Sequence, residues 1–137
     1  MRPVLSACVA VALWGCSDVR AGPTSDPLTG VAWRLADLNA RGVLAGSRIT
    51  LRFGDDGRAS GLGGCNRWSG DWRRQGSVLA ITRLGSTRTA CDAALVHQED
   101  VFLSALQEAD GYRLIDDRVL LVTTRDGRQL TFEPVTD

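Results

Sequence analysis

The sequence predicts an α+β fold, in which a curved, mostly antiparallel β-sheet or partial barrel of about seven or eight strands is closed by one α-helix. Three observations predict this fold. Several short segments alternate apolar and other residues with a period of two, which is typical of strands. The turns between them are short and rich in Gly and Asp, so neighbouring strands are expected to pair antiparallel. In one later segment the apolar period lengthens to three and four residues, which indicates a helix.

The first part of the predicted sheet follows from the period-two pattern and from its turns. Gly54–Gly57 suits the positive φ angles of a hairpin loop, and Gln75-Gly76 is a second turn. Trp68 and Trp72 are four residues apart, which places them on one face of a strand. Large aromatic side chains dominate small cores, so a core position is favoured for both over a pocket wall. The strands expected here are 31–35, 49–53, 58–62, 67–73 and 78–81.

The predicted helix begins after Asp92, a residue type that caps helix N-termini, and ends at Gly111. Residues at three- and four-residue steps mark its buried face, namely Leu95, Glu99, Phe102, Leu106 and Ala109. Asp116-Asp117 and Asp126-Gly127 are turn signals after the helix. The closing strands are expected at 112–115, 119–124 and 129–133.

Composition excludes several classes of function. The chain has 137 residues, which is room for one domain. Its 16 basic residues balance 16 acidic ones, which argues against electrostatic capture of nucleic acid. All the basic residues are arginine, so chemistry that needs a lysine, such as a Schiff base, is excluded.

Residues 1–15 are predicted to be a lipoprotein signal peptide. An apolar stretch at 4–14 follows Arg2, and it is too short to span a bilayer. Leu13-Trp14-Gly15-Cys16 resembles the bacterial lipoprotein cleavage box, although Trp14 is larger than usual at its position. The resemblance implies lipidation of Cys16. The alternative is an ordinary secreted or periplasmic soluble protein that is cut further on, near Ala21.

The expected organisation after cleavage is a flexible tether at 16–29 and one domain at 30–137, because the tether segment has two prolines and no periodic apolar pattern. Ser17 carries no inner-membrane retention signal in the resembled class. We therefore expect the periplasmic face of the outer membrane, with the membrane bound through the lipid anchor.

Two of the four cysteines predict a disulfide. Cys8 falls in the predicted signal peptide and Cys16 is the expected lipidation site, which leaves Cys65 and Cys91 as an even pair in a compartment where disulfides persist. Such a bridge stabilises by about 3.5 kcal/mol in the loop-closure treatment. The alternatives, a redox or zinc site, lack a Cys-x-x-Cys motif, and His97 is the sole further N or S ligand.

Two ordered segments carry a family resemblance. Residues 61–72 (GLGGCNRWSGDW) and 86–91 (STRTAC) resemble the two motif segments of the META/HslJ-like domain, and the match extends over about residues 31–133. Thr89 and Trp72 depart from the residues that are common there. The resemblance implies an α+β bacterial envelope protein, often a lipoprotein, linked to heat-shock or antibiotic stress, and it implies no catalytic mechanism. The motif positions are Gly64, Cys65, Asn66, Gly70, Thr87 and Cys91.

The glycine-cysteine-asparagine motif allows two interpretations. Gly63 and Gly64 permit backbone angles that other residues resist, so the segment suits a sharply bent strand that brings Cys65 toward Cys91. The alternative is an exposed binding loop that uses Asn66 and Arg67. The candidate binding residues are Asn66, Arg67, Trp68 and Trp72.

Binding is favoured over catalysis. His97 is the chain's one histidine, Asp100 lies at i+3 to it, and no Gly-x-Ser-x-Gly elbow is present. We expect a monomeric, non-enzymatic domain with no cofactor, no metal and no nucleic-acid partner. Its partner is expected to be an envelope protein or a hydrophobic small molecule. The alternatives are a carrier or pilot-like lipoprotein that uses the concave side of the sheet and, less favoured, a hydrolase that uses His97.

Overall fold

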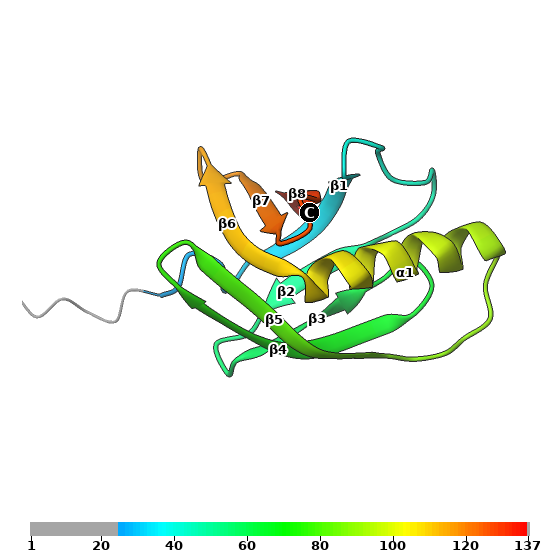
Figure 1. Cartoon of the computed structure of the whole chain (residues 1–137), viewed down its shortest axis with the longest axis horizontal. Coiled ribbons are helices and arrows are strands. Elements are labelled where there is room, and N and C mark those ends of the chain that lie inside the picture. The colour runs from blue at the N-terminus through cyan, green and yellow to red at the C-terminus, as the bar shows by residue number, and fades with distance from the viewer. Residues whose placement is uncertain (1–24, 137) are drawn as a thin grey trace, which may run out of the picture.

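The computed structural model describes residues 25–136. The expected signal peptide, Cys16 and most of the expected tether lie outside these residues. The described part contains eight antiparallel strands that follow one another in chain order around a closed barrel, and β1 pairs with β8 to complete it (Figure 1). The predicted fold class is confirmed. The strands are β1 (Ala32–Leu38), β2 (Thr50–Phe53), β3 (Arg58–Leu62), β4 (Arg67–Gln75), β5 (Val78–Ser86), β6 (Ala109–Ile115), β7 (Val119–Thr124) and β8 (Gln129–Pro134).

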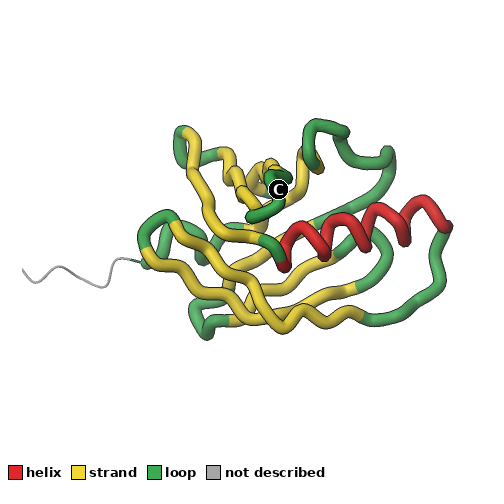
Figure 2. The backbone as a smooth tube through the Cα atoms, in the orientation of Figure 1, coloured by secondary structure: helices red, strands yellow, loops and turns green. Residues whose placement is uncertain are grey.

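Helix α1 (Ala93–Gln107) lies between β5 and β6 in the chain and packs against β5. These two strands are paired at one position, Val78 with Gly111. Phe102 and Leu106 of α1 are fully buried in the barrel core. In Figure 2 the helix lies between β4 and β5 on one side and β6, β7 and β8 on the other. The helix therefore closes the barrel where the strand ladder is interrupted.

The helix ends four residues before the expected position at Gly111. It stops at Gln107, and the carbonyl of Glu108 accepts a hydrogen bond from the Arg125 N–H at 2.9 Å, which ties the chain to the β7–β8 turn. Gly111 lies inside β6 instead. A Cβ at Gly111 would lie 3.0 Å from the Thr123 hydroxyl oxygen on β7, so this glycine permits a close approach of neighbouring segments rather than a helix end.

Aromatic side chains fill the interior of the barrel. The ring of Phe102 lies 6.0 Å from Trp68 and 6.4 Å from Phe132 between centroids. Trp68 is only 2 % exposed, so the expected core position is confirmed for it. Trp72 is half-buried at the edge of the core, 4.7 Å from the Phe53 ring, and its indole N–H donates to a backbone carbonyl of the β2–β3 loop.

The folded unit begins before the expected boundary at residue 30. Leu28 is completely buried in the core. Asp26 forms an ion pair with Arg74 on β4, and Thr29 forms a parallel bridge with Phe53. Residues 26–29 therefore belong to the barrel and not to the tether, because burial of the Leu28 side chain stabilises their attachment.

Candidate functional site

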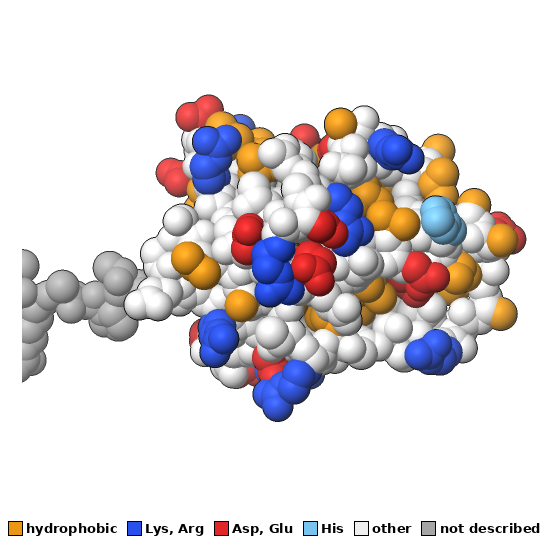
Figure 3. Space-filling model, in the orientation of Figure 1, with side chains coloured by type: hydrophobic (Ala, Val, Ile, Leu, Met, Phe, Trp, Pro, Cys, Tyr) orange, Lys and Arg blue, Asp and Glu red, His pale blue; other side chains and the backbone are white. Residues whose placement is uncertain are grey.

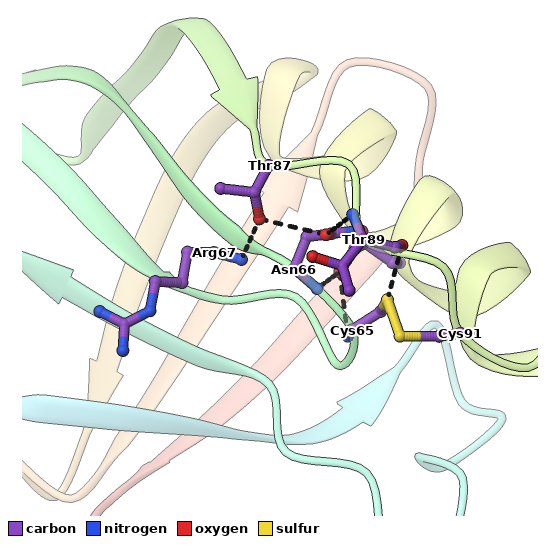
Figure 4. The surroundings of a disulfide bond; sticks show 7 residues. Cys65, Asn66, Arg67, Thr87, Thr89 and Cys91 are labelled. Carbon is purple, nitrogen blue, oxygen red and sulfur yellow. Dashed lines mark hydrogen bonds between the residues drawn. A yellow bond between two sulfur atoms is a disulfide. The ribbon is translucent and has the colours of Figure 1, made fainter.

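The disulfide between Cys65 and Cys91 joins the β3–β4 turn to the loop that precedes α1 (Figure 4). The two sulfur atoms are 1.99 Å apart and the two Cα atoms 6.0 Å apart, both normal for a disulfide. The predicted pairing is confirmed. It fixes the start of the helix against the sheet.

The turn that carries Cys65 requires glycine at two positions. Gly64 has a φ of +106°, in the region that side chains rarely adopt. A Cβ at Gly63 would lie 2.5 Å from the Oε2 atom of Glu99 on α1. The glycines therefore allow the turn backbone to lie directly against the Glu99 carboxylate.

The Glu99 carboxylate is the centre of a buried polar cluster. It is 4 % exposed, and its Oε2 atom accepts the backbone N–H groups of Cys65 at 3.0 Å and Asn66 at 2.6 Å. Its Oε1 atom accepts the Asn66 side-chain amide at 2.7 Å. Three donors thus compensate the burial of one charge, since hydrogen bonds to an ionised carboxylate are strong. The sequence pattern predicted Glu99 on the buried face of the helix but did not indicate which hydrogen-bond donors it contacts.

Asn66 links this cluster to the loop after β5. Its side-chain oxygen accepts the Thr89 backbone N–H at 2.7 Å and the Thr87 hydroxyl at 3.1 Å. The Thr87 oxygen in turn accepts the Arg67 backbone N–H at 3.2 Å. We call Cys65, Asn66, Thr87, Cys91 and Glu99 the Asn66–Glu99 cluster. It joins the β3–β4 turn, the loop before α1, and α1 itself.

The burial of Asn66 distinguishes the two interpretations of the motif. Asn66 is only 8 % exposed and its oxygen and amide groups are engaged inside the protein, which favours the sharply bent strand. Arg67 is exposed, and Figure 4 shows its side chain pointing away from the disulfide. Arg67 is thus the one residue of that pair whose side chain lies free for a partner.

The motif position Gly70 is also structural. A Cβ there would lie 2.6 Å from a side-chain carbon of Leu84 and 2.8 Å from the Thr82 carbonyl oxygen. β4 and β5 are paired across this point with a register shift between Ser69 and Asp71. The glycine therefore provides the space that the irregular pairing needs.

Two surface carboxylates are held in ionised form by arginines. Hydrogen bonds from Arg58, and then from Arg83, lower the pKa of Asp71. Arg128 and the Thr124 hydroxyl lower the pKa of Asp126 well below its usual range. Both carboxylates lie on the barrel surface, away from the buried Glu99.

The described residues contain no group of three or more His, Cys, Asp or Glu side chains arranged to hold a metal ion. Within residues 25–136, no helix has the length and apolar character needed to cross a membrane. His97 is exposed on α1 and lines a pocket beside the β1–β2 loop together with residues such as Leu44 and Val101.

Several solved structures resemble this chain. The solved structures that resemble the chain include a Burkholderia xenovorans protein determined by NMR, with 27 % identity and a TM-score of 0.64 over 99 % of this chain and 100 % of that one. A second NMR structure has 24 % identity and a TM-score of 0.64, over 80 % of this chain and 95 % of its own. A DUF4847 family protein from Bacteroides vulgatus ATCC 8482 has 18 % identity and a TM-score of 0.55, over 77 % and 93 % of the two chains. The last two show a shared fold alone.

Among curated proteins, none matches this chain. The family comparison is specific: the META domain matches residues 26–137, and this range includes Asp26 and Leu28, which pack onto the barrel ahead of β1. The match includes both cysteines of the disulfide and the whole Asn66–Glu99 cluster. The chain belongs to the META domain family.

Proposed function

We propose that the protein is a lipid-anchored domain of the bacterial cell envelope that acts by binding, without catalysis, in a stress-support role. The Cys65–Cys91 disulfide is the observation that carries this proposal. Structural disulfides persist in oxidising compartments and are rare in the cytosol. The Leu13–Cys16 segment supplies the means of attachment through lipidation of Cys16.

The chemistry of the described side chains supports binding over catalysis. The polar groups of Asn66 and Glu99 are used in internal hydrogen bonds. The pocket that His97 lines contains no Ser, Thr, Cys, Asp or Glu among its lining residues. A histidine base at that place would lack both a nucleophile and an orienting carboxylate. These observations disfavour the hydrolase alternative.

The barrel interior bears on the carrier alternative. The side chains of Trp33, Phe53, Phe102 and Phe132 are fully buried inside it. A hydrophobic ligand or a pilot-like partner would therefore bind on the outer surface rather than in the concave side of the sheet. We propose the periplasmic face of the outer membrane as the location, with a soluble periplasmic form as the alternative.

Acyl labelling and detergent-phase partitioning test the anchor. The wild-type chain is expected to incorporate labelled fatty acid and to enter the detergent phase, whereas Cys16→Ala should do neither. Cys8→Ala is the matched control, because Cys8 belongs to the segment that is expected to be removed. Equal partitioning of wild type and Cys16→Ala would refute the lipid anchor.

The compartment is tested separately by fractionation and thiol titration of the native protein. We expect it in the outer-membrane fraction, with no free thiol at Cys65 or Cys91. Recovery from the cytosol with both thiols free would refute the envelope location.

A further inference from the structure

A pocket of about 370 Å³ opens on the outside of the barrel, between the N-terminal half of α1 and the loop from β1 to β2. Leu38, Leu44, Ala94 and Val101 supply its apolar walls. Figure 3 shows hydrophobic side chains gathered around the histidine at this end of the molecule. The volume falls within the range of pockets that hold small molecules.

The β1–β2 loop beside the pocket adopts an unusual backbone conformation. Asn39 and Ala40 have φ angles of 53° and 61°, which residues with a Cβ seldom adopt. The carboxylate of Asp37 accepts the backbone N–H groups of Ala40 at 2.6 Å and Gly42 at 2.8 Å. Conformations of this kind persist where the surroundings hold them, and they are concentrated at binding sites.

The other end of the same loop is held by α1. Gln98 is 7 % exposed, its side-chain oxygen accepts the Leu44 N–H at 2.7 Å, and its side-chain nitrogen donates to the Ser47 hydroxyl at 3.0 Å. The loop is therefore fixed at both ends, and the pocket exists before any ligand arrives. A preformed pocket avoids the cost of ordering a loop on binding.

The formal charges in the pocket lining come from arginine. Arg41 and Arg128 line it, and no acidic side chain does. Arg128 is held by Asp126 and donates to the Val101 carbonyl oxygen and the Ser104 hydroxyl. Within residues 25–136, no ion pair engages the Arg41 guanidinium. An available guanidinium beside apolar walls complements a carboxylate on an apolar body.

We infer that this pocket binds a small monocarboxylate, whose apolar body lies against Leu38, Leu44 and Val101 and whose carboxylate pairs with Arg41. The inference rests on the binding role proposed above and names the class of ligand. It does not depend on the lipid anchor.

Octanoate is the probe for the first experiment. The full chain with Cys16→Ala, its disulfide intact, is titrated and followed by ¹H–¹⁵N NMR. Saturable shifts are expected at residues 38–44 and 94–101. Hexanoate should bind about tenfold more weakly, because it buries two fewer methylene groups. Shifts that do not saturate, or that spread evenly over the barrel, would overturn the inference.

Variants separate the apolar and the charged contributions. Ala94→Phe fills the pocket from the exposed face of α1 and should abolish octanoate binding, whereas Ala93→Phe, one residue earlier and outside the lining, should leave it unchanged. Arg41→Gln should weaken octanoate binding about five- to tenfold and leave octanol binding unchanged. Arg88→Gln, on an exposed loop, is the matched charge control.

The outcomes distinguish this inference from the proposed function. If Ala94→Phe and Ala93→Phe bind octanoate equally, the pocket assignment is wrong. If the wild-type chain is anchored in the envelope but does not bind octanoate, the pocket assignment fails and the location stands. If octanoate binds as expected but the native chain is cytosolic, the location fails and the pocket stands.

Discussion

The Glu99 carboxylate on α1 accepts hydrogen bonds from both the backbone N–H and the side-chain amide of Asn66, which lies in the β3–β4 turn. These two residues are 33 positions apart in the chain. Their contact explains the family motif in physical terms. The glycines, the asparagine and the disulfide together hold the β3–β4 turn against the buried Glu99 carboxylate of α1.

Glu99→Gln should therefore destabilise the fold. The amide group of glutamine can accept through one oxygen and not two, so buried N–H donors of the turn lose an acceptor, and we expect a loss of about 2–4 kcal/mol in the free energy of unfolding. Urea denaturation measures it. Asp100→Asn, at the next and exposed position of α1, serves as control, and equal stability of the two variants would contradict the role of Glu99.

Reduction of the disulfide should lower stability without abolishing the fold. The bridge closes a loop over a separation of 26 residues, and its loss should cost about 3.5 kcal/mol. The bonds of Asn66 to Thr87 and Thr89 remain, which keeps the loop attached. Urea denaturation with and without reductant provides the measurement. A Cys65→Ser, Cys91→Ser double variant should show no effect of reductant, and a reductant effect in it would disprove this assignment.

Gly63→Ala should displace the Glu99 carboxylate. The added methyl group would lie 2.5 Å from Oε2 and 2.8 Å from Cγ of Glu99, so helix and turn must move apart, at a cost of about 1–3 kcal/mol. Gly85→Ala is the control, because a Cβ there meets nothing within 4 Å and its φ is not in the left-handed region. Thermal and urea unfolding compare the two. Similar midpoints for both variants would show that the turn tolerates the methyl group.

Acid should weaken the barrel through Asp71 and Asp126. Arginine hydrogen bonds lower the pKa of both groups in the folded state. A lowered folded pKa contributes stability that is present above the unfolded value, about 3.9, and is lost as the pH falls through the folded value. Asp71→Asn and Asp126→Asn should therefore reduce the loss of stability between pH 5 and pH 2, as judged by urea midpoints across this range.

Asp55→Asn is the control for the acid series. Asp55 is exposed in the β2–β3 loop, where no ion pair of the described residues includes it. Added salt should shrink the effect of the Asp71 and Asp126 variants, because both pairs are at the surface. An acid response that is identical in all three variants would show that other carboxylates control it.

Local patterns predicted most of the elements. The turns at 54–57 and 126–127 contain a glycine with positive φ, as expected for such hairpins, and β3 and β7 have the predicted bounds. The cysteine pairing followed from elimination. β5 runs five residues past its expected end at 81, because pairing with β4 continues across residues 82–86 despite the positive φ of Arg83 and the lost alternation.

Features that depend on distant residues could not be predicted. The helix end depends on the bond between Glu108 and Arg125 in the β7–β8 turn. Leu28 belongs to the folded domain because it packs into the core, and strands much later in the chain are needed to complete that core. The Asn66–Glu99 contact could not be predicted, because an acidic residue on an apolar helix face does not indicate which hydrogen-bond donors will contact it. One signal was available: Glu99 occupied a position where the period required a buried side chain.

The single residue pair between β5 and β6 has a mechanical consequence. At this seam, side-chain packing of α1 replaces the ladder of backbone hydrogen bonds that joins β6, β7 and β8. Loosening of the helix would therefore admit water there first, and the amides beside the seam should exchange their hydrogens faster than those of β7. The disulfide holds the start of α1, whereas the β5–β6 seam lies near the other end of the helix. By limiting movement of α1, the disulfide therefore also stabilises this seam.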